Sequence, residues 1–73
     1  MKRYRVNIID KEKGLLTWRN CHDISVYYNH EVRRDVIRFR DHFGTLRQLY
    51  FAEGDGVQVI DNKTGLCVVE EWY

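Results

Sequence analysis

Residues 7–15 read NIIDKEKGL, and residues 58–66, near the other end of the chain, read QVIDNKTGL. Both stretches have one pattern: a polar residue, a β-branched residue, Ile, Asp, three polar residues, Gly and Leu. The aspartate can accept hydrogen bonds from the backbone amides that follow it, and glycine adopts a positive φ without steric cost. Each stretch therefore predicts a short hairpin loop with a glycine bulge. A looser version, Asp-His-Phe-Gly, occupies residues 41–44.

The flanks of these turns alternate between apolar and polar residues, which is the period of a strand with one buried face. Before the first turn, for example, Tyr4, Val6 and Ile8 alternate with Arg5 and Asn7. The chain contains no proline, so every residue can donate a backbone hydrogen bond to a neighbouring strand. Residues 53–56 read as a flexible connection before the last hairpin. The expected strands are residues 3–9, 15–20, 24–28, 46–51, 57–60 and 66–72.

Residues 30–43 fit two periodicities. As a helix, capped by Asn29, the segment would present one apolar stripe made of Val32, Val36, Phe39 and Phe43. As a strand, residues 36–40 alternate and lead through the turn at 41–44 into the next strand. We favour the strand, because β-branched and aromatic residues lower helix propensity and the turn matches the other two.

The resulting prediction is an all-β fold, a small antiparallel meander or partly open barrel of about six to seven strands built from hairpins. The alternative is an α+β fold in which one helix at about residues 30–43 packs on an antiparallel sheet.

The composition is that of one globular domain of 73 residues, with 44% apolar, 32% charged and 14% aromatic side chains. The formal net charge is only +1, but the charges are unevenly distributed. Residues 1–40 carry ten basic and five acidic side chains, and residues 41–73 carry two basic and six acidic ones. The halves are therefore net +5 and −4, so a near-neutral total conceals a basic half and an acidic half.

The compartment can be inferred from hydropathy and cysteine content. No apolar run approaches the roughly 18 to 20 residues of a membrane-spanning helix, and the N-terminus lacks a signal-peptide core. Two cysteines, Cys21 and Cys67, are too few for the disulfide framework of a small secreted domain, so we expect free thiols. We therefore expect a cytoplasmic protein without a membrane partner.

Arginine is the main candidate for partner binding, because four of the eight arginines fall within residues 33–40. Its planar fork suits phosphates, carboxylates and aromatic faces, although a solvated charged face is the alternative interpretation. The turn at 41–44 decides which arginines share a face. With a four-residue loop, Arg38 lies opposite Arg47 and Arg40 joins them on one face. With a three-residue loop, the pairing slips and Arg47 moves to the other face.

Aromatic residues lie on both sides of this cluster, with Tyr27 and Tyr28 before it and Phe43, Tyr50 and Phe51 after it. Such interleaving is typical of a platform that stacks single-stranded bases. Arginine, tyrosine and tryptophan are also the residues that dominate protein interface hot spots. The small core needs many of the same rings, so both binding interpretations compete with a purely structural one.

The second half of the chain holds an acidic set, Glu53, Asp55, Asp61, Glu70 and Glu71. If the last hairpin gathers them, they form a negative patch that steers a basic partner or pairs with another copy. Surface solubility is the alternative. We expect Trp72 to dock the last strand onto the core, whereas an exposed Trp72 and Tyr73 would anchor an interface.

No catalytic or metal-binding pattern is evident. Cys21 and His22 are adjacent, and adjacent strand residues point to opposite faces, so they do not form a nucleophile and base. The cysteines and histidines lack the paired spacing of a zinc site. We expect no cofactor, no metal and no enzymatic activity.

The sequence therefore predicts a non-catalytic intracellular binding protein: a small regulator or inhibitor, of the type that phages and mobile elements encode, that docks on a larger protein. One alternative is a single-stranded nucleic-acid-binding domain that uses the arginine and aromatic surface. A second is a homo-oligomer, such as a homodimer, formed by pairing of strand edges. The candidate partner-binding residues are Tyr27, Tyr28, Arg33, Arg34, Arg38, Arg40, Phe43, Arg47, Glu53, Asp55, Glu70 and Glu71.

Overall fold

The computed structural model describes residues 2–73 and shows an all-β protein. Six antiparallel strands form one open sheet, and the described residues contain no helix. The prediction of an all-β fold is confirmed, and the helical alternative for residues 30–43 is wrong, because a hairpin turn and a strand occupy this segment. The strands are β1 (Tyr4–Asp10), β2 (Gly14–Asn29), β3 (Arg34–Arg40), β4 (Leu46–Tyr50), β5 (Gly56–Asp61) and β6 (Cys67–Trp72).

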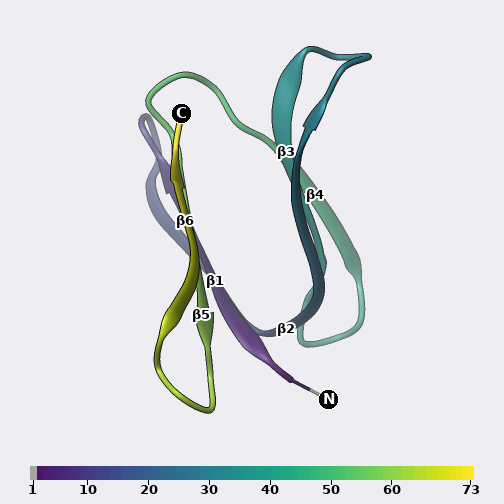
Figure 1. The fold of residues 1–73 in the computed structure, drawn as a ribbon, viewed down its shortest axis with the longest axis vertical. Coiled ribbons are helices and arrows are strands. Elements are labelled where there is room, and N and C mark those ends of the chain that lie inside the picture. The colour runs from purple at the N-terminus through teal and green to yellow at the C-terminus, as the bar shows by residue number, and fades with distance from the viewer. Residues whose placement is uncertain (1) are drawn as a thin grey trace.

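The strand order across the sheet is β4-β3-β2-β1-β5-β6. The first four strands form a meander, but the connection after β4 returns to the other side of β1, so the fold is not a meander throughout. Figure 1 shows this connection crossing the open end of the molecule between β4 and β5. Strands β4 and β6 are consequently the two edges of the sheet.

Strand β2 is the corner of the fold. Its first part pairs with β1 and its second part pairs with β3, and the register shifts in each pairing, once near Asn20 and once near Asp23. Both residues have positive φ, 54° and 53°. Such bulges bend a strand and increase its twist. The expected strands 15–20 and 24–28 are therefore one bent strand, and the sheet has six strands rather than seven.

This bend divides the sheet into two facing halves (Figure 1). Half A comprises β1, β5, β6 and the first part of β2, and half B comprises β3, β4 and the second part of β2. The core lies between them, with Trp18 packed edge-on against Phe39 at 5.5 Å between ring centroids. The buried core residues are Val6, Ile8, Cys21, Ile37, Phe39, Phe51, Val57 and Val59.

The C-terminal residue, rather than Trp72, docks the last strand onto this core. The Tyr73 ring stacks on Phe51 at 4.6 Å, and its backbone exchanges hydrogen bonds with the 54–55 segment. Trp72 is 61% exposed and lies over Gly56, where an added β-carbon would come within 2.5 Å of the indole. The expectation that Trp72 fills the core is wrong, because β6 turns that side chain to the outer face.

The glycine-bulge turns are confirmed. All three glycines of the repeated pattern have positive φ, and the aspartate accepts backbone hydrogen bonds in each turn: Asp10 from Glu12 and Lys13, for example, at 2.8 and 2.9 Å. The β2–β3 turn is built in the same way from other residues. There Asn29 Oδ1 accepts the amide of Glu31, and Arg33 holds the left-handed position with φ 55°.

Candidate functional site

The β3–β4 turn fixes which arginines face which way. The Asp41 amide donates to the Thr45 carbonyl at 3.0 Å, which closes a three-residue loop. Arg40 then pairs with Leu46 and Arg38 with Gln48. The four-residue register, with Arg38 opposite Arg47, is therefore wrong, and the three-residue alternative is the one that forms.

Arg47 lies opposite Phe39, on the side of the sheet that faces the core, and it is held there by Asp41. Its Nε donates to Asp41 Oδ2 at 3.0 Å, while the amides of Phe43 and Thr45 donate to Oδ1 at 2.9 and 3.0 Å. Burial alone would raise the pKa of Asp41, but these hydrogen bonds outweigh it and hold the pKa below its ordinary value of 3.8. Arg47 is thus neutralised within the fold.

The other strand arginines share the opposite, outer face. Arg34, Arg38 and Arg40 alternate along β3, and side chains two residues apart on a strand point to the same side. Between Arg34 and Arg38 lies Val36, which is completely buried although it faces outward. Val36 is flanked on neighbouring strands by Tyr27 and Tyr50. We call this surface the β3 arginine face; its residues are Arg34, Arg38, Arg40, Tyr27, Val36 and Tyr50.

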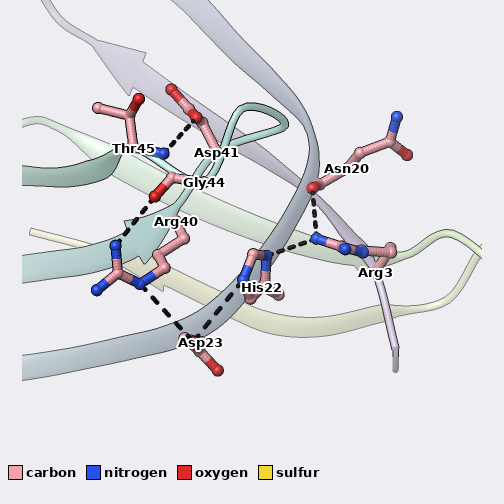
Figure 2. A network of polar contacts seen from close by, with 8 residues as sticks. All are labelled: Arg3, Asn20, His22, Asp23, Arg40, Asp41, Gly44 and Thr45. Atoms are coloured by element: carbon pink, nitrogen blue, oxygen red, sulfur yellow. Dashed lines mark hydrogen bonds and ion pairs between the residues drawn. The ribbon is translucent and has the colours of Figure 1, made fainter.

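Two of the three arginines have partners within the fold. The Arg34 guanidinium lies over the Tyr50 ring, 5.8 Å from its centroid, and its Nε donates to the Phe51 carbonyl. Arg40 donates to the Gly44 carbonyl at 2.9 Å and lies 4.0 Å from Asp23 (Figure 2). Within residues 2–73, Arg38 has no hydrogen-bond or ion-pair partner. It lines a shallow groove with Asp23, Ser25, Tyr27, Arg40 and Leu46.

A polar network joins this face to the corner of β2 (Figure 2). Arg3 donates to Nδ1 of His22, so that nitrogen carries no proton and Nε2 is the protonated one. Nε2 faces the Asp23 carboxylate at 3.8 Å, and the same carboxylate approaches Arg40. Arg3 also donates to the Asn20 carbonyl at 3.4 Å. The network therefore ties the N-terminal segment to both bulges of β2 and brings the exposed Asp23 carboxylate beside the face.

The structure separates the remaining basic and aromatic candidates from this face. Tyr28 lies opposite Asp35, on the other side of the sheet from Tyr27, and packs against His30 at 4.9 Å. Phe43 is 87% exposed at the tip of the β3–β4 turn, and Arg33 lies in the β2–β3 turn. Tyr50 belongs to the face; the sequence places it among the aromatic residues near the arginine cluster, but it is not in the list of partner-binding residues, because its side of the sheet depends on the β3–β4 register.

The acidic residues do not form one patch. Asp55 and Asp61 are each 6% exposed and support loops: Asp55 accepts the amides of Ala52 and Lys11 at 2.7 and 3.1 Å, and Asp61 accepts that of Lys63. Glu70 and Glu71 are neighbours on β6 and point to opposite faces. Glu53 lies in the connection between β4 and β5. The last hairpin therefore does not gather these residues into one negative patch, because Asp55 and Asp61 are buried and Glu70 and Glu71 point to opposite faces.

The cysteines are free, Cys21 in the core and Cys67 at the surface. Burial raises the pKa of the Cys21 thiol to about 11, so this thiol is protonated at neutral pH. Across residues 2–73, no three His, Cys, Asp or Glu side chains are close enough together to hold a metal ion. The same part of the chain has no helix of the length and hydropathy that would cross a membrane.

Comparison of the chain with protein-family models, with curated proteins and with solved structures gave no match. The candidate site is accordingly defined by geometry alone. It is the β3 arginine face, where the outward side of one strand presents three cations beside a single carboxylate.

Proposed function

We propose that this chain is a small, non-catalytic intracellular regulator or inhibitor that docks its β3 arginine face on an acidic surface of a larger protein. The observation that carries the proposal is Arg38, an exposed arginine at the centre of the face without a partner in residues 2–73. Arg34 and Arg40 flank it on the same side of the same strand.

The electrostatics of the face favour an anionic partner. Outward side chains on one strand are spaced about 7 Å apart, so the charges of Arg38 and Arg40 repel each other. One carboxylate, Asp23, approaches Arg40, and the separation of 4.0 Å makes it a weak pair. Carboxylates of a partner would bind the guanidinium forks in pairs and relieve this repulsion. An acidic protein surface supplies such groups.

The aromatic residues of the face favour a protein over single-stranded nucleic acid. Base stacking needs open ring faces, but Arg34 covers the ring of Tyr50 and Tyr27 is only partly exposed. Val36 fills the space between the two tyrosines. Arginine and tyrosine around a buried apolar centre resemble the composition of protein hot spots.

Affinity capture from the native host's lysate tests this function. The baits are the wild-type chain, an Arg38→Ala/Arg40→Ala variant and a Lys13→Ala/Lys63→Ala control, each with and without nuclease. The control removes the same charge from two exposed turn residues outside the face. We expect a protein that survives nuclease, is retained by the lysine control and is lost from the arginine variant.

Two results would contradict the proposal. Equal capture by the arginine variant and the wild type would show that the face is not the binding surface. Recovery of nucleic acid alone, abolished by nuclease and weakened by salt, would assign the face to phosphate binding instead.

A further inference from the structure

The two edge strands, β4 and β6, expose backbone groups that no neighbouring strand satisfies. The Thr45 carbonyl and the Phe51 amide both bond toward β3, so by alternation the backbone groups of Leu46, Gln48 and Tyr50 point away from it. In β6, Tyr73 bonds toward the 54–55 segment, so the backbone groups of Trp72 and Glu70 point outward. Both edges are therefore able to accept another strand.

The same edges carry exposed apolar side chains. Leu46 and Tyr50 on β4 are 46% and 43% exposed, and Val68 and Trp72 on β6 are 53% and 61% exposed. Leu46, Tyr50 and Trp72 belong to residues whose backbone groups point outward, whereas Val68 lies at the register shift of β6, where this alternation is interrupted. Large apolar side chains on an edge strand add affinity when a second strand brings a matching pair beside them.

We propose that β4 of one copy of this chain pairs with β6 of a second copy, in an antiparallel register that places Gln48 opposite Glu70. Five antiparallel steps separate β4 from β6 within the sheet, so these strands run in opposite directions. A second copy that continues the sheet therefore brings them together antiparallel. Up to the register shift of β6 at Val68, the opposed residues are then Leu46 and Trp72, Arg47 and Glu71, Gln48 and Glu70, and Leu49 and Val69.

This register satisfies the backbone, charge and apolar requirements of the two edges at the same time. It opposes Leu46 with Trp72 and Gln48 with Glu70, whose backbone groups all point outward, and it uses four of the five residues of β4. It sets Glu71 opposite Arg47, which also keeps its bond to Asp41, and it brings the exposed Leu46 and Trp72 side chains together. A shift by two residues keeps the backbone pattern but separates the charges and leaves strand ends unpaired.

Pairing of like edges is less favourable. Two β6 strands in a symmetric antiparallel pair oppose Glu70 with Glu70, or Glu71 with Glu71, in the two registers centred on those residues, and like charges opposite each other destabilise a sheet. Two paired β4 strands would bring their arginines together, and β4 contains no carboxylate to pair with them. The complementary edges therefore give a head-to-tail contact, which continues from copy to copy unless it closes into a ring.

Proline blocks each edge separately, because it removes an outward N–H that the monomer does not use. Gln48→Pro blocks β4, and Glu70→Pro blocks β6. By sedimentation velocity at rising concentration, we expect the wild type to grow beyond a dimer and each variant to associate at least tenfold more weakly. An equimolar mixture of the variants should form a heterodimer that grows no further, because each chain keeps one complementary edge.

The proposal is overturned if the wild type stays monomeric at the highest concentration, or if one edge variant associates as strongly as the wild type. The second result would indicate pairing of like edges. Arg38→Ala should associate like the wild type, since the contact uses strand edges, so failure of this pairing and failure of the proposed function can be distinguished.

Disulfide crosslinking tests the same pairing even if the proline variants do not fold. In a Cys67→Ser background, a Gln48→Cys chain is mixed with a Glu70→Cys chain under mild oxidation. Opposed residues of a hydrogen-bonded antiparallel pair lie about 5.5 Å apart between Cα atoms, within disulfide range. We expect crosslinking at least tenfold faster than for Gln48→Cys mixed with Lys63→Cys, and equal rates would contradict the register.

Discussion

The outer faces of the two sheet halves use their polar side chains differently. On half A, Thr17 donates to Asn7 at 3.0 Å and Gln58 donates to Glu70 at 2.8 Å, each to the residue directly across from it. On half B, the corresponding central position is Arg38, which lies between Ser25 and Gln48 and contacts no carboxylate within residues 2–73. Half A pairs these polar side chains with each other, although Arg5 Nε on the same face is buried without a hydrogen-bond partner, whereas half B leaves Arg38 exposed and without a partner within residues 2–73.

The contrast extends to the hairpin turns. The β5–β6 turn of half A places Gly65 in the left-handed region at φ 74°, where glycine has no steric penalty. The β2–β3 turn of half B places Arg33 there at φ 55°. The β2–β3 turn therefore has a strained arginine at the position where the β5–β6 turn has a relaxed glycine.

Replacing the free arginine should produce the largest effect on binding. For Arg38→Ala we expect about 2 kcal/mol of lost affinity for the captured partner, or roughly 30-fold, with unfolding free energy unchanged within about 0.5 kcal/mol. Arg47→Ala should do the opposite, lowering the unfolding midpoint through the loss of its Asp41 bond and leaving affinity intact. Titration calorimetry and urea unfolding measure the two quantities, and parallel losses in both variants would contradict the separation of the faces.

Relaxing the strained turn should give the next largest effect. We expect Arg33→Gly to raise the unfolding free energy by about 1 kcal/mol, because a left-handed conformation costs an ordinary L-residue about 1 to 2 kcal/mol. Gly65→Ala, in the matching turn of half A, should lower it by a similar amount. Urea unfolding of both variants checks the pair, and destabilisation by Arg33→Gly would show that the side chain has a structural contact.

On half A, polar side chains directly across from each other are hydrogen-bonded. Giving Arg38 of half B such a partner should have a smaller effect on stability. Ser25 lies directly opposite Arg38, so Ser25→Glu supplies the missing carboxylate. We expect about 0.5 kcal/mol of added stability from the opposed charges, together with weaker partner binding. Ser25→Gln, which has the same size without the charge, is the control. Stronger partner binding by Ser25→Glu would mean that the face does not recognise anions.

Acid should produce the smallest change, and two carboxylates with a lowered pKa contribute to it: Asp10, through backbone hydrogen bonds from Lys13 and Glu12, and Asp41. Because each folded pKa lies below its ordinary value of 3.8, each contribution is fully present above about pH 4 and is lost as the pH falls through the folded pKa. Thermal melts from pH 5 to pH 2 should show a falling midpoint, and Asp41→Asn should flatten part of that dependence. An unaltered slope in the variant would exclude Asp41 as one of the responsible groups.

The sequence predicted the strands and turns of the fold better than the way in which they connect. Asp and Gly spacing identified three turns, and alternation identified the strands, because both signals are local. The continuity of β2 was not predictable, since Asn20 and Asp23 adopt positive φ only where the sheet bends and read as strand breaks in isolation. Seven expected strands thus became six.

Site prediction depended on register for the same reason. Alternation predicted that Arg38 and Arg40 share a face, but assigning Arg47 to the other face required the Asp41–Thr45 hydrogen bond, which no local pattern specifies. Asp55 and Asp61 were assigned to a surface patch because they are charged. Their carboxylates are instead buried to satisfy loop amides, a role that appears only when distant segments meet.

The most direct test of the central claim is an NMR titration of the isotope-labelled chain with its captured partner. If the β3 arginine face is the docking surface, amide shifts should move most in residues 25–27, 34–40 and 46–50, together with the Arg38 side-chain signal. If the largest shifts fall instead on the outer face of half A, around Asn7, Thr17, Gln58 and Glu70, the account is contradicted.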